Sequence, residues 1–160
     1  MPAISSIRHV GIVVRDIEAS LQFYEGVLGL ETYRREIEEG QFINQLTGLD
    51  SVKLEWVKLI IPNGGLIELL QYHYPPDPLT KSNPIPAPSN RLGCSHVALT
   101  AIDLQEIYRL MLERGYPTKS PPILTANRKA LIMYCHDPDG TIVELIQDLK
   151  TPKTSSSDRS

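Results

Sequence analysis

An internal repeat is the feature that most constrains how this chain can fold. Residues 62–71 align with residues 138–147 at a shift of 76 positions, and the two segments share proline, glycine, glutamate, leucine and glutamine at matching places. His9 aligns with His96 at a shift of 87 positions, so the second copy is the shorter one. A repeat of this kind indicates two copies of one supersecondary unit that together bury a common core.

Each copy is predicted to contain a strand, a helix and then further strands. The first strands are expected at residues 7–14 and 95–100, where β-branched and other apolar residues alternate with polar ones. Asp16 and Asp103 are the predicted N-caps of the two helices, and a glycine ends each helix. Turn-forming sequences join the returning strands in pairs, which are expected at residues 52–61 with 66–72, and 129–136 with 141–147.

Length and composition indicate one soluble domain. The chain has 160 residues, of which 41% are hydrophobic and 22% are charged, and its net charge is −3. The absence of a basic excess argues against a nucleic-acid partner, and the absence of a long apolar run argues against a membrane span. Two cysteines without a Cys-x-x-Cys motif, and no signal sequence, favour a cytoplasmic location.

The repeat also defines the expected domain organisation. A single domain is predicted over residues 5–148, followed by a disordered tail at residues 149–160. The domain is expected to consist of module one, a proline-rich linker and module two, at residues 5–73, 74–91 and 92–148.

One histidine and one glutamate recur at matching places in the two copies: His9 with Glu68, and His96 with Glu144. If the copies pair about a pseudo-twofold axis, the two imidazoles and two carboxylates converge on one point. Such a donor set suits a divalent ion. Each residue considered alone is more typical of a structural role, but their recurrence in register favours a metal site.

The chain resembles the vicinal oxygen chelate superfamily, which includes glyoxalase I, methylmalonyl-CoA epimerase, extradiol dioxygenases and bleomycin- and fosfomycin-resistance proteins. The resemblance spans about residues 5–148. It implies an α+β fold in which two paired βαβββ modules form a curved, cup-shaped mixed sheet around a metal site. It also implies one divalent metal ion (Ni, Co, Zn, Mn or Fe), with these four ligands: His9, Glu68, His96 and Glu144. The segments that carry it are residues 9–16, 20–24, 27–30, 65–69, 95–98 and 137–145.

The resemblance implies an enzyme that transfers a proton next to a carbonyl of a small thioester or thiohemiacetal, like lactoylglutathione lyase or methylmalonyl-CoA epimerase. Glu144 is the first candidate for the base and Glu68 the second. An additional glutamate, as in epimerase-like members, could be Glu38, Glu39 or Glu55. The family habit is a homodimer, and the four ligands could come from one subunit or from two.

Two other functions remain as alternatives. One is an Fe(II) ring-cleaving dioxygenase, which the presence of Glu68 disfavours because those relatives use two histidines and one carboxylate. The other is a non-catalytic resistance protein that binds a drug, which the complete ligand set disfavours. No clear binding set for glutathione or for the phosphates of CoA is visible in the sequence. Side chains that could line a substrate cavity, although strand aromatics are more often core residues, are Trp56, Phe42, Met133 and Tyr134.

Overall fold

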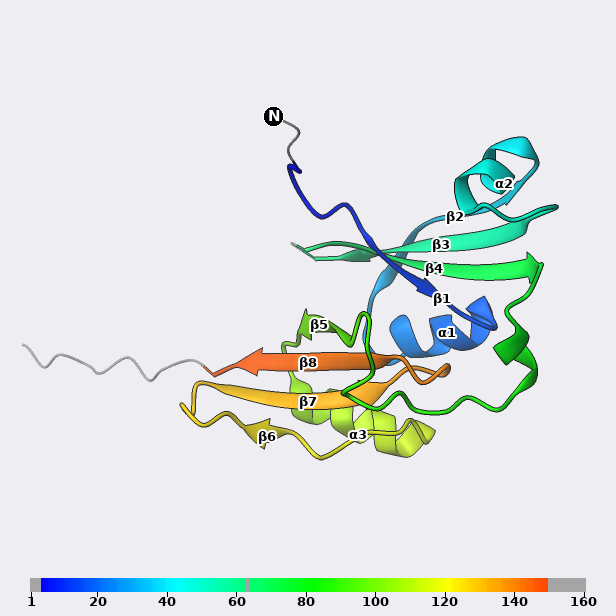
Figure 1. Cartoon of the computed structure of the whole chain (residues 1–160). Helices are drawn as coiled ribbons and strands as arrows, with labels where there is room; N and C mark the ends of the chain where they lie inside the picture. The colour runs from blue at the N-terminus through cyan, green and yellow to red at the C-terminus, as the bar shows by residue number, and fades with distance from the viewer. Residues whose placement is uncertain (1–3, 63, 150–160) are drawn as a thin grey trace, which may run out of the picture.

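The computed structural model describes residues 4–62 and 64–149 and contains two mixed four-stranded sheets with helices (Figure 1). The predicted tail at 149–160 lies, apart from its first residue, outside the described residues. No helix in the described part is long and apolar enough to cross a membrane. In chain order the elements are β1 (Val10–Val13), α1 (Ile17–Tyr24), β2 (Glu31–Glu39), α2 (Gln41–Thr47), β3 (Lys53–Ile61), β4 (Gly65–Tyr74), the 3₁₀ helix η1 (Pro78–Lys81), β5 (His96–Thr100), α3 (Leu104–Arg114), β6 (Ile123–Leu124), β7 (Ala130–His136) and β8 (Ile142–Asp148).

The two sheets have the same topology. The first has the strand order β1-β4-β3-β2 and the second the order β5-β8-β7-β6. In each sheet the edge strand that opens the module pairs in parallel with the last strand, and the remaining pairs are antiparallel. This topology confirms the predicted α+β class and the paired modules. Within one chain the two sheets remain separate and do not close into a single sheet.

The glutamine shared by the two repeats has a structural role in both. The Gln71 side chain accepts a hydrogen bond of 2.8 Å from the Ile17 amide, and Gln147 accepts one of the same length from the Leu104 amide. These amides open α1 and α3 and would otherwise lack a partner within their helices. The last strand of each module therefore caps the N-terminus of that module's helix.

Both predicted aspartate caps are confirmed. The Asp16 carboxylate accepts from the Ala19 amide at 3.1 Å, and Asp103 accepts from Glu106 at 3.0 Å. By contrast, α2 and β2 were not predicted. The β2 sequence contains a dense run of charges, which is typical of a solvated surface, and it forms an exposed edge strand. The strand forms because its backbone pairs with β3, and the residue types of β2 alone do not indicate this pairing.

The helix-bearing faces of the two sheets contribute to one apolar core. Ile67 and Leu69 of β4 and Val143 and Leu145 of β8 all belong to it and are almost fully buried. Figure 1 shows α1 between the two sheets, whereas α2 covers the opposite face of the first sheet. The first sheet is therefore covered by α1 on one face, and part of its other face lies beneath α2.

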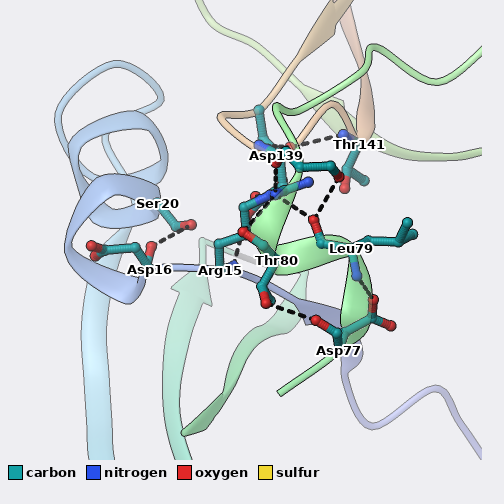
Figure 2. A network of polar contacts seen from close by, with 10 residues as sticks. Arg15, Asp16, Ser20, Asp77, Leu79, Thr80, Asp139 and Thr141 are labelled. Carbon is teal, nitrogen blue, oxygen red and sulfur yellow. Dashed lines mark hydrogen bonds and ion pairs between the residues drawn. The ribbon is translucent and has the colours of Figure 1, made fainter.

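A polar network around Arg15 joins module one, module two and the connecting segment (Figure 2). The Arg15 Nε atom lies 2.7 Å from the Asp139 carboxylate, whose other oxygen accepts from the Arg15 amide at 3.0 Å. The same guanidinium donates to the carbonyl oxygens of Leu79, Thr80 and Ser82. Both charged side chains are largely buried, so their contact is less screened than a surface ion pair. A single side chain thus fixes the path of the linker against both modules.

Asp137 lies beside this network at the junction of the modules and is 2% exposed. It accepts hydrogen bonds from the amides of Asp139 and Thr141, and from the Tyr24 hydroxyl of module one at 3.0 Å. Burial raises the pKa of Asp137 from its ordinary 3.8 to about 6, although the hydrogen bonds from Thr141 and Tyr24 oppose this change. The ionised carboxylate is therefore disfavoured in the folded chain.

Replacing Asp137 by asparagine is expected to stabilise the chain at neutral pH. Because the folded state binds the Asp137 proton more tightly than the unfolded state, the free energy of unfolding falls as the pH rises through about 4 to 6. Asparagine has a similar shape without the charge. We expect Asp137→Asn to be more stable than the parent by about 1–3 kcal/mol near pH 7.5, and to lose this advantage below about pH 4.

Urea unfolding of both proteins at the two pH values measures this difference, with the exposed Asp50→Asn as the control substitution. An Asp137→Asn difference that is the same at both pH values would contradict the assignment.

Candidate functional site

The first half of the candidate site is a histidine–glutamate pair in module one. His9 immediately precedes β1, and Glu68 lies on β4, the parallel partner of β1. The His9 Nε2 atom is 3.0 Å from the Glu68 Oε2 atom, and the two side chains are 35% and 12% exposed. Because Ile67 and Leu69 face the core, the alternation of the strand places Glu68 on the opposite face.

The second half repeats this arrangement in module two. His96 begins β5, and its Nε2 atom is 2.8 Å from the Oε2 atom of Glu144 on β8. The other ring nitrogen of His96 lies 3.1 Å from the Ser95 hydroxyl, and the ring packs near Tyr134 at 5.2 Å between centroids. These contacts define the orientation of the His96 ring. Ser95 was not predicted as a site residue, although its place directly before the histidine could have indicated it.

The structure brings the four predicted ligands together as two pairs and not as one cluster. Among residues 4–62 and 64–149, no group of three or more histidine, cysteine, aspartate or glutamate side chains is arranged to hold a metal ion. Convergence of all four in one cavity is therefore not found within a single chain. Each pair alone supplies only two donors, whereas catalytic sites such as those of zinc enzymes use three protein ligands and an open position.

The donor chemistry of each pair nevertheless fits a divalent ion. Each pair holds an imidazole nitrogen and a carboxylate oxygen within 3.0 Å of one another, and both are common ligands of Zn, Ni, Co, Fe and Mn. Each glutamate is largely buried and has a histidine as its partner. Both histidines are partly exposed. Two such half sites together would supply two nitrogens and two carboxylates.

The two half sites differ at the position opposite the glutamate. Lys58 on β3 lies opposite Glu68, and at the same repeat shift Tyr134 on β7 lies opposite Glu144. The Lys58 Nζ atom is 3.1 Å from the Glu68 Oε1 atom and 4.3 Å from the centre of the Trp56 ring. Sequence reasoning missed Lys58. Extending the repeat alignment backwards through the hairpin would have placed it beside the glutamate.

A cavity of about 550 Å³ adjoins the first half site. His9, Lys58 and Glu68 line one part of it, and α2 covers the sheet over another part. The predicted substrate residues Trp56 and Phe42 both line this cavity. Its size is within the range of small-molecule sites.

The other two predicted substrate residues lie in module two. Met133 is 1% exposed and belongs to the common core, because it lies on the helix-bearing face of β7. This placement corrects the expectation that Met133 lines a substrate cavity. Tyr134, the next residue, lies on the other face beside His96. Met133 and Tyr134 face opposite sides of the sheet because successive side chains alternate along a strand.

The three additional glutamates occupy different environments. Glu38 lines the cavity and accepts a hydrogen bond of 2.9 Å from the Trp56 indole. Glu39 is exposed and paired with Lys53. Glu55 lies on the face of β3 that points away from the cavity. Of the three glutamates, only Glu38 lines the cavity.

Glu55 is a buried carboxylate whose two cationic partners are half-exposed. Its carboxylate contacts the Arg35 guanidinium at 2.6 Å and the His73 Nε2 atom at 2.8 Å. Burial alone would raise the pKa of Glu55, but the hydrogen bonds from His73 and Arg35 outweigh it and lower the pKa below its ordinary value. These contacts indicate a role in the stability of the first sheet.

Comparisons with known proteins agree with this architecture. Residues 6–145 match the model of the glyoxalase/bleomycin resistance protein/dioxygenase superfamily. The chain belongs to this superfamily. The predicted resemblance to the vicinal oxygen chelate proteins is thereby confirmed. The superfamily includes enzymes such as glyoxalase I, and its members typically bind a divalent metal.

The chain is also similar to a curated protein sequence and to solved structures. The uncharacterized protein YwbC of Bacillus subtilis is 28% identical over 145 residues, which cover 88% of this chain and 96% of YwbC. A glyoxalase family protein of Bacillus cereus is 25% identical and superposes with a TM-score of 0.82, covering 93% of this chain and 97% of that one. The trypanothione-dependent glyoxalase I of Leishmania major is 19% identical, with a TM-score of 0.60 and coverages of 90% and 87%, and it supports the fold alone.

The different environments of Glu55 and Glu38 predict different effects of neutralising them. Glu55→Gln is expected to lower the free energy of unfolding by about 1–3 kcal/mol at neutral pH, because hydrogen bonds to a buried charge are lost. Since the folded pKa of Glu55 is lowered, this contribution is present above about pH 4.5 and disappears as the pH falls through the folded pKa. Urea unfolding followed by circular dichroism tests it.

Glu38→Gln is the comparison, and the exposed Glu39→Gln is the control. Glu38→Gln is expected to change the emission of folded Trp56, the single tryptophan, with little loss of stability. If Glu55→Gln changes this emission and leaves the stability intact, the assignment of faces is wrong.

Proposed function

We propose that this chain is a divalent-metal-dependent enzyme of the glyoxalase type. It transfers a proton at a carbon next to a carbonyl, in a small thioester or thiohemiacetal substrate. The observation that carries the proposal is the duplicated histidine–glutamate pair, which has the same register in both modules: His9 with Glu68, and His96 with Glu144. Membership of a superfamily that contains glyoxalase I supports it.

In the proposed enzyme His9, Glu68, His96 and Glu144 hold one divalent ion. The bound ion would supply Lewis-acid stabilisation of negative charge that develops on the substrate's carbonyl oxygen. The residues of the chain hold the substrate and move the proton. Proton transfer by a positioned side chain contributes roughly 10²–10⁴-fold to rate.

Glu144 is the proposed base. Both oxygens of Glu68 already have partners, because His9 contacts one and Lys58 contacts the other. For Glu144 only the contact of one oxygen with His96 is found in the described part of the chain. Its second oxygen can therefore accept a proton without first breaking an ion pair. Tyr134, which lies opposite Glu144, brings no formal positive charge to compete for that oxygen.

We further propose that two copies of the chain complete the site. His9 precedes the edge strand β1 and His96 begins the edge strand β5, so each pair lies beside a sheet edge to which residues 4–62 and 64–149 add no further strand. Joining the β1 edge of one copy to the β5 edge of another would bring a pair from module one to a pair from module two. A symmetric dimer would repeat this contact and contain two complete sites.

Complementation between two inactive variants tests the shared site. His9→Ala breaks the module-one half of each site, and His96→Ala breaks the module-two half. Each variant alone is expected to lose tight binding of Ni²⁺ or Zn²⁺. In a mixed dimer of the two variants, one site would carry both substitutions and the other would be intact. We expect coexpression to restore metal binding to about one ion per mixed dimer, measured by elemental analysis and calorimetry.

The control is Ser89→Ala, which changes an exposed side chain of the linker. If the mixed dimer binds no more metal than its parents, the sites are not shared between copies. If the parent protein binds no divalent metal, the proposed function itself is wrong.

Glu144→Gln tests the base. The metal-loaded parent protein is expected to exchange the proton next to the carbonyl of a suitable thioester for solvent deuterium. The variant, which has the same shape but cannot accept the proton, is expected to slow this exchange at least about a hundredfold. Nuclear magnetic resonance of the substrate in deuterated buffer measures it.

A Glu144→Gln variant that keeps its metal and exchanges at the parent rate would rule out Glu144 as the base. Consumption of oxygen by the iron-loaded protein with catechol would instead favour the ring-cleaving alternative.

A further inference from the structure

The serine before His96 connects the module-two half site to the linker. The Ser95 Oγ atom lies 3.1 Å from the His96 Nδ1 atom and 3.3 Å from the backbone carbonyl oxygen of Ser89. The other ring nitrogen, His96 Nε2, lies 2.8 Å from the Glu144 carboxylate. These groups form one chain of polar contacts, which runs from the carboxylate on β8 through the ring and the hydroxyl to the linker.

Counting donors and acceptors leaves two arrangements for this chain of contacts when the ring is neutral. The Ser95 hydroxyl has one proton, so it can donate to His96 or to Ser89 but not to both. A neutral imidazole has a proton on one of its two nitrogens. If Nε2 donates to Glu144, Nδ1 has no proton and accepts from the Ser95 hydroxyl. If Nε2 has no proton, Nδ1 donates to the Ser95 oxygen, and the hydroxyl proton can reach the Ser89 carbonyl.

The second arrangement is the one that suits a metal ligand. A histidine nitrogen binds a metal through its lone pair, so Nε2 must be without a proton. The other N–H of such a histidine usually donates to a fixed acceptor, which orients the ring. The Ser95 oxygen is in the right place to be that acceptor for His96. The direction in which the Ser95 hydroxyl donates therefore depends on whether Nε2 is a ligand.

Module one has a different residue at the equivalent position. At the repeat shift of 87 positions, Arg8 stands where module two has Ser95. For His9, the contact of Nε2 with Glu68 is the one side-chain polar contact found within residues 4–62 and 64–149. His9 therefore gives an internal reference for a histidine–glutamate pair without the serine.

We propose that Ser95 is a positioning residue that holds the His96 ring for metal binding and transmits the occupancy of this half site to the linker. When Nε2 is a ligand, the Ser95 hydroxyl donates to the Ser89 carbonyl instead of to the ring. Ser89 lies in a turn that the Arg91 amide closes by donating to the Pro88 carbonyl at 3.2 Å. The turn thereby gains a hydrogen bond. The proposal rests on the proposed function, because it takes His96 as a metal ligand.

Nitrogen nuclear magnetic resonance of the histidine rings tests the contact without metal, because the resonance of each ring nitrogen shows whether it carries a proton. At a pH where the rings are neutral, we expect the metal-free parent protein to carry the His96 proton on Nε2. Ser95→Ala is expected to move the resonance of His96 Nδ1, which loses its donor, and to leave the His9 ring unchanged. Identical His96 resonances in the parent and in Ser95→Ala would overturn the proposal.

Zn²⁺ binding tests the connection to the linker. Calorimetry is expected to show about tenfold weaker Zn²⁺ binding by Ser95→Ala, and restored binding by Ser95→Thr, which keeps the hydroxyl. Saturating Zn²⁺ is expected to slow hydrogen exchange of the Arg91 amide about two- to tenfold in the parent and in Ser95→Thr, but not in Ser95→Ala. Ser5→Ala removes an exposed hydroxyl before β1 and is the control that matches the parent.

Equal Zn²⁺ affinity of the parent and Ser95→Ala would overturn the proposal. Slower exchange of the Arg91 amide in Zn²⁺-saturated Ser95→Ala would also overturn it, because the linker would then respond without the hydroxyl. A parent protein that binds no Zn²⁺ would refute the proposed function and the transmission to the linker. The metal-free resonances would still decide whether Ser95 holds the His96 ring.

Discussion

The alternation of side chains along β4 and β8 is the constraint on which the candidate site depends. Ile67 and Leu69 anchor β4 in the core, so the glutamate between them must face the other way. Val143 and Leu145 impose the same orientation on Glu144. The apolar residues that stabilise each sheet therefore also place its carboxylate next to a histidine. A slip of one residue in either strand would bury the charge and expose the core.

Much of this could be predicted from the sequence because the repeat carries local information. The N-cap aspartates, the hairpins and the alternating strands all depend on residues close together in the chain, and the repetition shows which positions matter. The His9–Glu68 and His96–Glu144 pairings follow from the same register. The predicted residue Trp56 does line the cavity, whereas the alternation of β7 places Met133 on the core face, where it was not expected.

The rest depends on contacts between distant segments, which no local pattern encodes. The orientation of the modules is determined by a common core and by Arg15, whose partners are a turn of module two and carbonyl oxygens of the linker. Every residue has a backbone carbonyl, so the sequence does not show which of them will accept a hydrogen bond from Arg15. The separation of the four predicted ligands into two pairs also depends on how the two modules pack against each other, which no local pattern encodes. Likewise, α2 has a weak helical pattern, and its place over the first sheet emerges only when Ile43 packs beside Trp56.

The substitution of lysine in one repeat for tyrosine in the other has a stereochemical consequence. If one half site of each kind held the proposed ion, an ammonium group would lie beside a carboxylate of the first half and a phenol ring beside the histidine of the second. A planar substrate bound there would meet two chemically unlike halves. This difference between lysine and tyrosine would make such a chamber handed, so that protonation of the two faces of the same carbon need not be equivalent.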